Sequence, residues 1–172
     1  MSDLQGKWTI DHAHSTIGFV VRHAVSKVKG EFTDFTSEVV STGPDTADVT
    51  ATVQAASFSS RNEMRDNHIK SADFLDAENF PTLDFTGKVA DGKLSGDLTI
   101  HGVTRPIAFD LDSIEVAKDP FGGPDFAGTE ATAEISRKDF GLTWNQTLET
   151  GGVLVGDKVK IDLDVSFLRV TE

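Results

Sequence analysis

Apolar and polar residues alternate with a period of two along most of the chain. This alternation is typical of β-strands that bury one face. The runs that carry it are Ser15–His23, Lys27–Val40, Asp48–Ala55, Thr82–Val89, Leu94–Ile100, Arg105–Asp112, Thr129–Arg137 and Val159–Phe167. About eight such strands, joined by short connections, predict antiparallel pairing in a sandwich or a closed barrel.

Turn signals and a change of parity refine this prediction. The sequences Asp91–Gly92 and His101–Val103 each predict a tight turn. Within the second run the apolar parity switches between Phe32 and Phe35, which predicts a bulge at residues 33–34. The stretch 118–126 is rich in proline and glycine, so we expect a loop there.

The stretch Arg65–Phe85, RDNHIKSADFLDAENFPTLDF, interrupts the alternation with charged residues followed by aromatic ones. One short helix is predicted from about Asn62 to Lys70, with a Ser or Asn at its start as the N-cap. We expect this stretch to cap one end of the barrel, with an ion pair between Arg65 and Asp66 holding it in place. Movement around residues 71–80 would then open the end.

The predicted architecture is one domain over residues 1–172, an extended eight-stranded antiparallel β-barrel with one short helix capping an end. A barrel of eight strands has room for packed side chains or for one slender ligand. Small inward-facing residues would favour a cavity, whereas interdigitation of the 12 Phe rings would fill it. The residue pattern leaves both interiors open.

Composition excludes several classes of protein. The formal net charge is −12 and no basic stripe is visible along the sequence, so nucleic acids and anionic membrane surfaces are unfavourable partners. The chain has no Cys, which excludes disulfides and thiolate chemistry. No apolar run is long enough to insert stably in a membrane. The opening MSDLQGKW has no secretory signal pattern, so none is expected.

The histidines give only a weak metal hypothesis. His12 and His14 are two residues apart and would share a face of a strand, with a third ligand from His23, His68 or His101. No HExxH motif occurs, and histidines at turns usually form structural hydrogen bonds. We therefore predict neither a metal nor a cofactor.

Catalytic patterns are equally weak. Ser15 follows His14, and Asp66 lies near His68, but adjacency along the chain does not make a catalytic triad. There is no GxSxG, GxGxxG or phosphate-binding glycine loop. A non-enzymatic protein is therefore predicted.

The segment Arg137–Gly152, RKDFGLTWNQTLETGG, fits neither a plain strand nor a simple turn. Trp144 beside Asn145 places a large ring next to a polar side chain. This segment could be an aromatic plug at the barrel end, a ligand contact, or both.

Four motifs in order resemble those of the YceI family. They are WTIDHAHSTIGFVVRH at residues 8–23, RDNHIKSADFLDAENFPTLDF at 65–85, GDLTIHGVTRPI at 96–107 and ISRKDFGLTWNQTLETGGVLVGDKVKIDLDV at 135–165. The resemblance spans nearly the whole chain. It implies a lipocalin-like barrel whose apolar tunnel binds a polyisoprenoid or similar long-chain amphiphile, and so favours the cavity over the packed core. It also implies a homodimer, and, without a signal, a cytoplasmic protein.

The leading hypothesis is therefore a non-catalytic carrier or sequestering protein for a long-chain isoprenoid or fatty amphiphile. The candidate tunnel residues are Ile17, Phe19, Val21, Phe32, Phe85, Leu98, Ile100, Phe109, Ala133, Ile135 and Trp144. Candidates to meet a polar head group at the cap are Arg22, His23, Arg65 and His68. The alternatives are a hydrolase or isomerase acting on a bound amphiphile, and a fully packed, stress-related barrel without ligand.

Overall fold

The structure is a computed structural model that describes residues 4–171. Its strands are β1 Gly6–Ile10, β2 Thr16–His23, β3 Ser26–Phe32, β4 Phe35–Ser41, β5 Ala47–Gln54, β6 Phe58–Ser59, β7 Thr82–Ala90, β8 Lys93–Ile100, β9 Val103–Leu111, β10 Glu115–Ala117, β11 Phe126–Ser136 and β12 Val155–Arg169. The helical elements are α1 Glu63–Lys70 and the 3₁₀ turns η1 His12–His14, η2 Ala55–Ser57 and η3 Arg137–Phe140. Among the described residues no helix has the length and apolar character that a membrane crossing requires.

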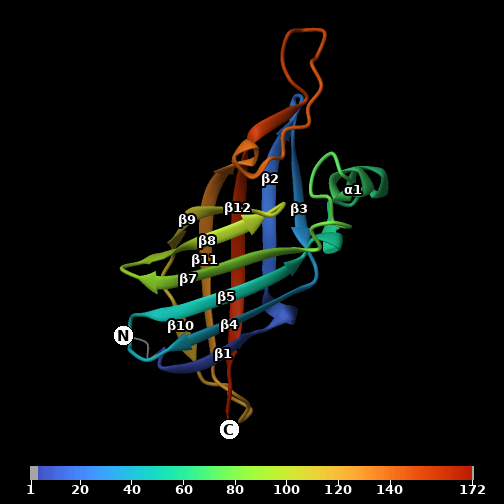
Figure 1. Cartoon of the computed structure of the whole chain (residues 1–172). Coiled ribbons are helices and arrows are strands. Elements are labelled where there is room, and N and C mark those ends of the chain that lie inside the picture. Colours follow the sequence, from blue (N-terminus) through green and yellow to red (C-terminus); the bar gives the residue numbers. More distant parts are fainter. Residues whose placement is uncertain (1–3, 172) are drawn as a thin grey trace.

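Antiparallel pairing closes the sheet into a barrel (Figure 1). The order of strands around the ring is β12, β1, β4, β5, β7, β8, β9 and β11. The ring closes because the whole length of β11 pairs with β12. The contact between β9 and β11 is the short one, with only Ala131 opposite Leu111 and Thr132 opposite Asp110. The prediction of an eight-stranded antiparallel barrel with one short helix is confirmed.

The strand β12 is long enough to pair with two different strands along the same edge. Its C-terminal end pairs with β1, and its N-terminal part pairs with β2. The hairpin β2–β3 therefore extends the wall upward beyond the ring in the view of Figure 1. We call the end of the barrel at this hairpin the upper end.

The predicted irregularity at residues 33–34 lies where the chain passes from the extension to the ring. It is a break between β3 and β4 rather than a bulge within one strand. Before the break the chain pairs with β2, and after it with β1. The parity switch between Phe32 and Phe35 thus marks a change of partner, and both rings stay buried.

Both predicted tight turns are present. Asp91 and Gly92 have φ values of 53° and 75°, and His101 and Gly102 have 56° and 72°. Two successive positive φ values define the turn type whose twist matches an antiparallel hairpin. These turns join β7 to β8 and β8 to β9.

The predicted helix is confirmed as α1. Asn62 is its N-cap, and its side-chain oxygen accepts a hydrogen bond from the backbone N–H of Arg65 at 3.0 Å.

The predicted ion pair between Arg65 and Asp66 is wrong. Both side chains bind Ser60 instead: Arg65 donates to its hydroxyl and carbonyl oxygens, and Asp66 accepts from its N–H and hydroxyl. Ser60 is buried and satisfies both groups, so the two charges need no direct contact.

Candidate functional site

An internal cavity of about 370 Å³ lies inside the barrel. Its volume falls within the range of about 300–1,000 Å³ found for small-molecule sites. It reaches from residues near the chain termini, such as Leu4 and Phe167, to Trp144 and Leu154 at the upper end. The lining side chains are almost all apolar, because the inward positions of every ring strand carry Val, Ile, Leu, Phe or Ala.

One strand shows how long the cavity is. Residues of β12 from Val155 to Phe167 line it at alternate positions, with a register shift between Val155 and Val159. Twelve residue steps at about 3.3 Å correspond to about 40 Å along the strand. A cavity of this length and of the volume given above is narrow, so its shape fits an extended chain better than a compact ring system.

Most of the predicted tunnel residues line this cavity. They are Ile17, Phe19, Val21, Phe32, Phe85, Leu98, Ile100, Phe109, Ile135 and Trp144. Ala133 is the exception, because it packs against the apolar core cluster without reaching the cavity surface. Their role in ligand binding stays a prediction.

The predicted head-group residues divide into two sets. His23, Arg65 and His68 line the cavity near its upper end. Arg22 does not: it is exposed on the outer face of β2, opposite Lys27 of β3. Strand alternation explains the difference, since Val21 and His23 point inward and the residue between them must point outward.

Three aromatic rings meet at the upper end of the cavity. The ring of His68 lies 4.6 Å from that of Trp144 and 5.2 Å from that of Phe74, and the latter two are 5.3 Å apart. The Nε2 atom of His68 lies 2.9 Å from a carboxylate oxygen of Asp73. These contacts join α1 and the segment after it to the segment that follows η3. Trp144 lines the cavity beside these rings, and its two roles, as a plug and as a ligand contact, stay predictions.

Arg137 organises the segment opposite α1. Its side chain is only 3% exposed, and its guanidinium donates to the carbonyl oxygens of Gly156 at 2.8 Å and Val155 at 3.2 Å. It donates further to those of Leu142 at 2.7 Å and Trp144 at 2.9 Å. One buried cation thus fixes a stretch of irregular backbone that has few strand partners of its own.

Asn145 completes this attachment. Its amide group donates to the carbonyl of Val155 at 2.7 Å and accepts from the N–H of the same residue at 2.9 Å. The side chain therefore reproduces the pair of bonds that a strand neighbour would make. We call α1, residues 71–80, η3 and residues 141–154 together the upper closure.

Electrostatics at the upper closure have identifiable causes. Burial lowers the pKa of Arg137, and the nearby carboxylate of Asp157 partly offsets this effect. The pKa of Asp157 is lowered, chiefly by a hydrogen bond from the Ser136 hydroxyl at 2.6 Å and further by the backbone N–H of Lys138. Asp157 therefore stays ionised and supports the positive charge of Arg137.

Arg137 is the main site residue missing from the predicted set. A signal for it was present, because Ala131, Ala133, Ile135 and Arg137 share one parity. A charged residue that continues an inward-facing series is expected to be buried and fully hydrogen-bonded. Phe74 and Leu142 lie outside any alternating run, so periodicity could not predict that they line the cavity.

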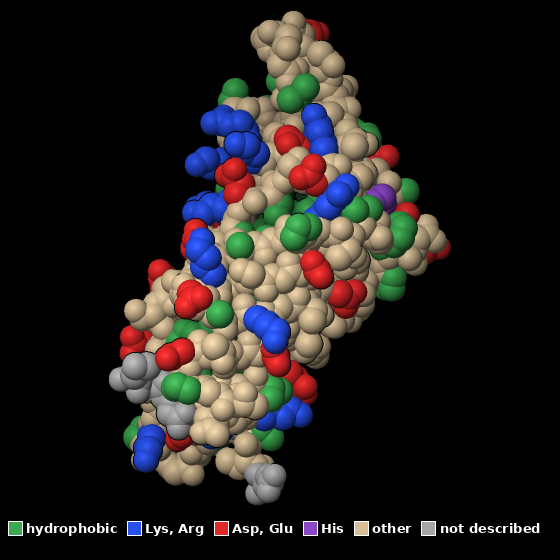
Figure 2. Space-filling view, turned by 60° about the vertical axis from the view of Figure 1, so that its left-hand side comes forward, with side chains coloured by type: hydrophobic (Ala, Val, Ile, Leu, Met, Phe, Trp, Pro, Cys, Tyr) green, Lys and Arg blue, Asp and Glu red, His purple; other side chains and the backbone are tan. Residues whose placement is uncertain are grey.

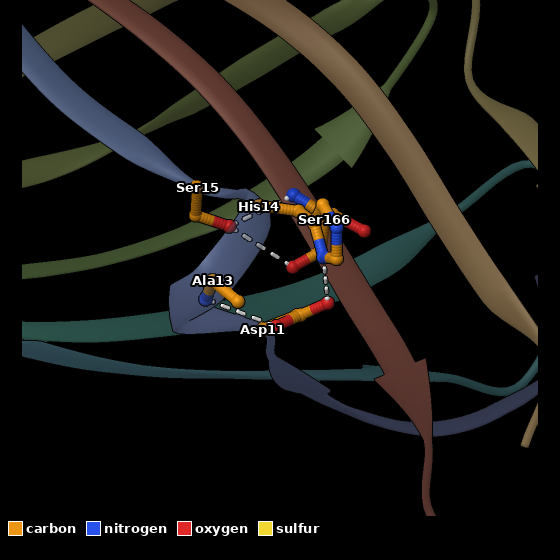
Figure 3. A network of polar contacts seen from close by, with 5 residues as sticks. All are labelled: Asp11, Ala13, His14, Ser15 and Ser166. Atoms are coloured by element: carbon orange, nitrogen blue, oxygen red, sulfur yellow. Dashed lines mark hydrogen bonds and ion pairs between the residues drawn. The ribbon is translucent and has the colours of Figure 1, made fainter.

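Asp11, His14 and Ser15 belong to a hydrogen-bond network around η1 that does not join the serine to the imidazole (Figure 3). His14 Nδ1 lies 2.7 Å from Asp11, but the Ser15 hydroxyl bonds the backbone of Ser166 on β12 instead of the imidazole. The Ser15 hydroxyl thus attaches the end of η1 to β12 in the barrel wall.

The histidines do not converge in the described part of the chain. There, no group of three or more His, Cys, Asp or Glu side chains could hold a metal ion. The ring of His12 packs on Phe35 at 4.8 Å, and that of His101 packs on Phe80 at 4.7 Å. These two rings therefore have structural neighbours.

Comparison with known proteins agrees with the architecture. The YceI-like domain matches residues 8–167. A UPF0312 protein of Staphylococcus aureus (strain MSSA476) is 41% identical over 164 residues, which cover 93% of this chain and 96% of that protein. The Campylobacter jejuni YCEI protein crystal structure superposes with a TM-score of 0.68 at 31% identity, covering 86% of this chain and 88% of that one.

A more distant structure shares the fold alone. A polyisoprenoid binding domain from Saccharophagus degradans, implicated in plant cell wall breakdown, has a TM-score of 0.68 at 14% identity, with 95% and 98% of the two chains covered. The family match covers nearly all of the barrel, from Trp8 on β1 to Phe167 on β12. The chain therefore belongs to the YceI-like family.

Proposed function

We propose that this protein is a non-catalytic carrier or sequestering protein for a polyisoprenoid or similar long-chain amphiphile. The observation that carries the proposal is the narrow apolar cavity that runs along the barrel. Such a space favours a ligand that is slender and apolar over most of its length. The Saccharophagus degradans domain, a polyisoprenoid binding domain of the same fold, supports the same ligand class.

Energetics indicate what the cavity would select. Each buried CH₂ group contributes about 0.8 kcal/mol, so one five-carbon unit contributes about 4 kcal/mol before ordering costs. Because affinities saturate near about 18–21 kcal/mol, a long chain gains little from its last units. The wall is apolar along most of its length, so it distinguishes poorly between one segment of such a chain and the next. Chain length would then be set by where the cavity ends.

The upper end is where a polar head group would lie. His23, Arg65 and His68 line the cavity there, and each carries N–H groups that could donate to an oxygen of the ligand. Movement of residues 71–80 would admit the ligand. A homodimer and a cytoplasmic location stay predictions alongside this proposal.

Native mass spectrometry and organic extraction of the purified protein test the proposal. A reproducible co-purifying lipid of one mass is expected. A protein that is empty and whose melting temperature does not rise with added long-chain isoprenoids would contradict it and favour the packed, ligand-free barrel. Turnover of the extracted lipid by the pure protein would instead favour the hydrolase or isomerase alternative.

A matched pair of variants on β5 makes the test specific. Ala51 lines the cavity, whereas its neighbour Thr50 is exposed on the outer face. Ala51→Trp should block the cavity and lower the retained lipid at least tenfold, because the indole occupies the ligand's space. Thr50→Trp adds the same ring outside and should retain the lipid. Equal retention by both variants would place the ligand elsewhere.

A further inference from the structure

The outer face of β12 changes from basic to acidic along its length. Alternate residues of this strand line the cavity, so the residues between them face outward. In chain order these are Lys158, Lys160, Asp162 and Asp164. The two lysines lie toward the upper end and the two aspartates toward the C-terminus. Charge is therefore segregated along a single strand.

Strand pairing extends the basic half across the neighbouring hairpin. Lys160 lies opposite Val20, which in turn lies opposite Lys29, and one row higher Arg22 lies opposite Lys27. Strands about 4.8 Å apart place these side chains on one continuous patch. We call it the basic face; its members, all exposed, are Arg22, Lys27, Lys29, Lys158 and Lys160. Figure 2 shows Lys and Arg side chains gathered along the upper left-hand edge.

Acidic neighbours only partly offset the basic face. Lys158 lies 3.5 Å from Glu134, and Lys160 lies 3.6 Å from Asp162, and all four side chains are exposed. Exposed ion pairs of this kind are weak because water and salt screen them. Within residues 4–171 the other three members of the basic face form no ion pair. A chain of net charge −12 thus carries a local surplus of cations.

Apolar side chains project beside the basic face. Val25 at the tip of the β2–β3 hairpin is 95% exposed, and Val153 in the loop before β12 is 57% exposed. The two segments are joined, because the N–H of Ala24 donates to the carbonyl of Leu154 at 2.7 Å. The loop before β12 is the uppermost part of the molecule, and the hairpin tip lies below it (Figure 1). We call Val25 and Val153 the apolar tip. Glu149 is the acidic residue of the same loop.

This apolar tip adjoins the cavity. His23 of β2 is paired with Val155 of β12, and both line its upper end. A surface that engaged the tip and the basic face would therefore lie directly outside the upper end of the cavity.

We propose that the apolar tip and the basic face dock on the surface of an anionic phospholipid bilayer. The apolar tip enters the headgroup layer, and the basic face lies against the lipid phosphates. A bilayer interface accommodates both kinds of side chain, whereas a solvated nucleic-acid backbone offers no place for two exposed valines. The biological use, passage of ligand between membrane and cavity, rests on the proposed function; the docking itself does not.

The overall negative charge does not oppose this docking at short range. Charges are screened over about 8 Å at physiological ionic strength, so the bilayer responds mainly to the side chains that touch it. Each Lys or Arg near an anionic surface contributes about 1 kcal/mol, which is about fivefold in partition coefficient. The attraction comes from the few cations that touch the bilayer. The net charge of the whole chain does not reveal such a patch, and it therefore predicted that anionic membrane surfaces are unfavourable partners.

Vesicle flotation with the full chain tests the proposal. The wild-type protein should bind vesicles of phosphatidylglycerol and phosphatidylcholine in equal parts more tightly than pure phosphatidylcholine vesicles, and raised salt should weaken the binding. Lys27→Gln combined with Lys29→Gln should lower the partition coefficient about 25-fold. Lys7→Gln combined with Lys88→Gln alters net charge equally at exposed sites distant from the tip and should change it less than twofold.

The apolar and acidic residues of the tip supply further tests. Val25→Ser should weaken vesicle binding several-fold, whereas Phe121→Ser, at another highly exposed apolar residue, should not. Glu149→Gln should strengthen binding. Equal binding to both vesicle types, no binding to either, or tighter binding to duplex DNA than to anionic vesicles would each overturn the proposal. None of these results would bear on lipid retention in the cavity, so the proposed function stands or falls separately.

Discussion

The barrel wall and the upper closure bound the same cavity by different physical means. In the wall, every ring strand has paired neighbours, and apolar side chains at alternate positions face inward. In the upper closure the backbone outside α1 and η3 is irregular, and side chains hold residues 141–154, above all those of Arg137 and Asn145. Many small contributions stabilise the wall, whereas a few specific groups stabilise the closure.

This difference has a consequence for function. Loss of one apolar contact from the wall changes the cavity surface but leaves the hydrogen-bonded ladders intact. Loss of one polar group from the upper closure leaves several buried carbonyl oxygens without a donor, which is costly. Regions of few strand pairs also open at lower free energy than the sheet around them. We therefore expect the closure to open before the wall does.

The largest expected effect comes from Arg137→Met. The variant keeps most of the side-chain volume but removes the donor for four backbone carbonyls, so the free energy of unfolding should fall by about 3–5 kcal/mol. Urea denaturation measures the loss. Hydrogen exchange should show amides at 141–156 exchanging faster while those of β7 and β8 keep their protection.

Arg105→Met is the matched control for that variant. Arg105 is exposed and donates to the carbonyl of Asp139 at 3.0 Å, so its loss should cost less than about 1 kcal/mol. If the two variants lost equal stability, or if exchange rose uniformly over the barrel, the wall and the closure would form one cooperative unit.

The difference between the strand-paired wall and the closure held by side chains also explains what could be predicted from the sequence. Period-two alternation predicted every ring strand except β1, and paired turn residues such as His101–Gly102 predicted two of their connections. The inward set then followed from parity. Arg22, predicted with His23 to meet a head group, lies on the outer face of β2 instead, as strand alternation requires.

The hydrogen bonds that hold the upper closure and the places of the short strands could not be predicted in this way. Arg137 binds carbonyl groups of residues up to 19 positions away, and backbone carbonyls carry no sequence signal. The strands β1, β6 and β10 are short, and β1 is held in the ring by pairing with β4 on one side and with the C-terminal end of β12 on the other. The basic face likewise depends on register between strands that are distant in sequence.

A smaller effect is expected from Asn62→Ala at the start of α1. The variant removes the side-chain oxygen that accepts from the N–H of Arg65, and loss of an N-cap costs about 1 kcal/mol. Amides of the first turn of α1 should exchange faster, with little change in β11 and β12. Asn67→Ala, at an exposed position within the same helix, keeps the cap and should leave exchange unchanged or slower. Equal acceleration by both variants would contradict the role of the cap.

The smallest expected effect is the pH dependence contributed by Asp157. Hydrogen bonds lower the folded-state pKa of this carboxyl below its ordinary value of 3.8. Its contribution to stability is therefore fully present above that value and is lost as the pH falls through the lower folded-state pKa. Carboxyl NMR titration should place the midpoint of Asp157 below 3.8. Ser136→Ala removes the leading cause and should raise the midpoint, whereas Thr132→Ala, an exposed hydroxyl on the same strand, should not. A midpoint unmoved by Ser136→Ala would show that this hydroxyl does not stabilise the charged carboxylate, and that the support of Arg137 by Asp157 has another origin.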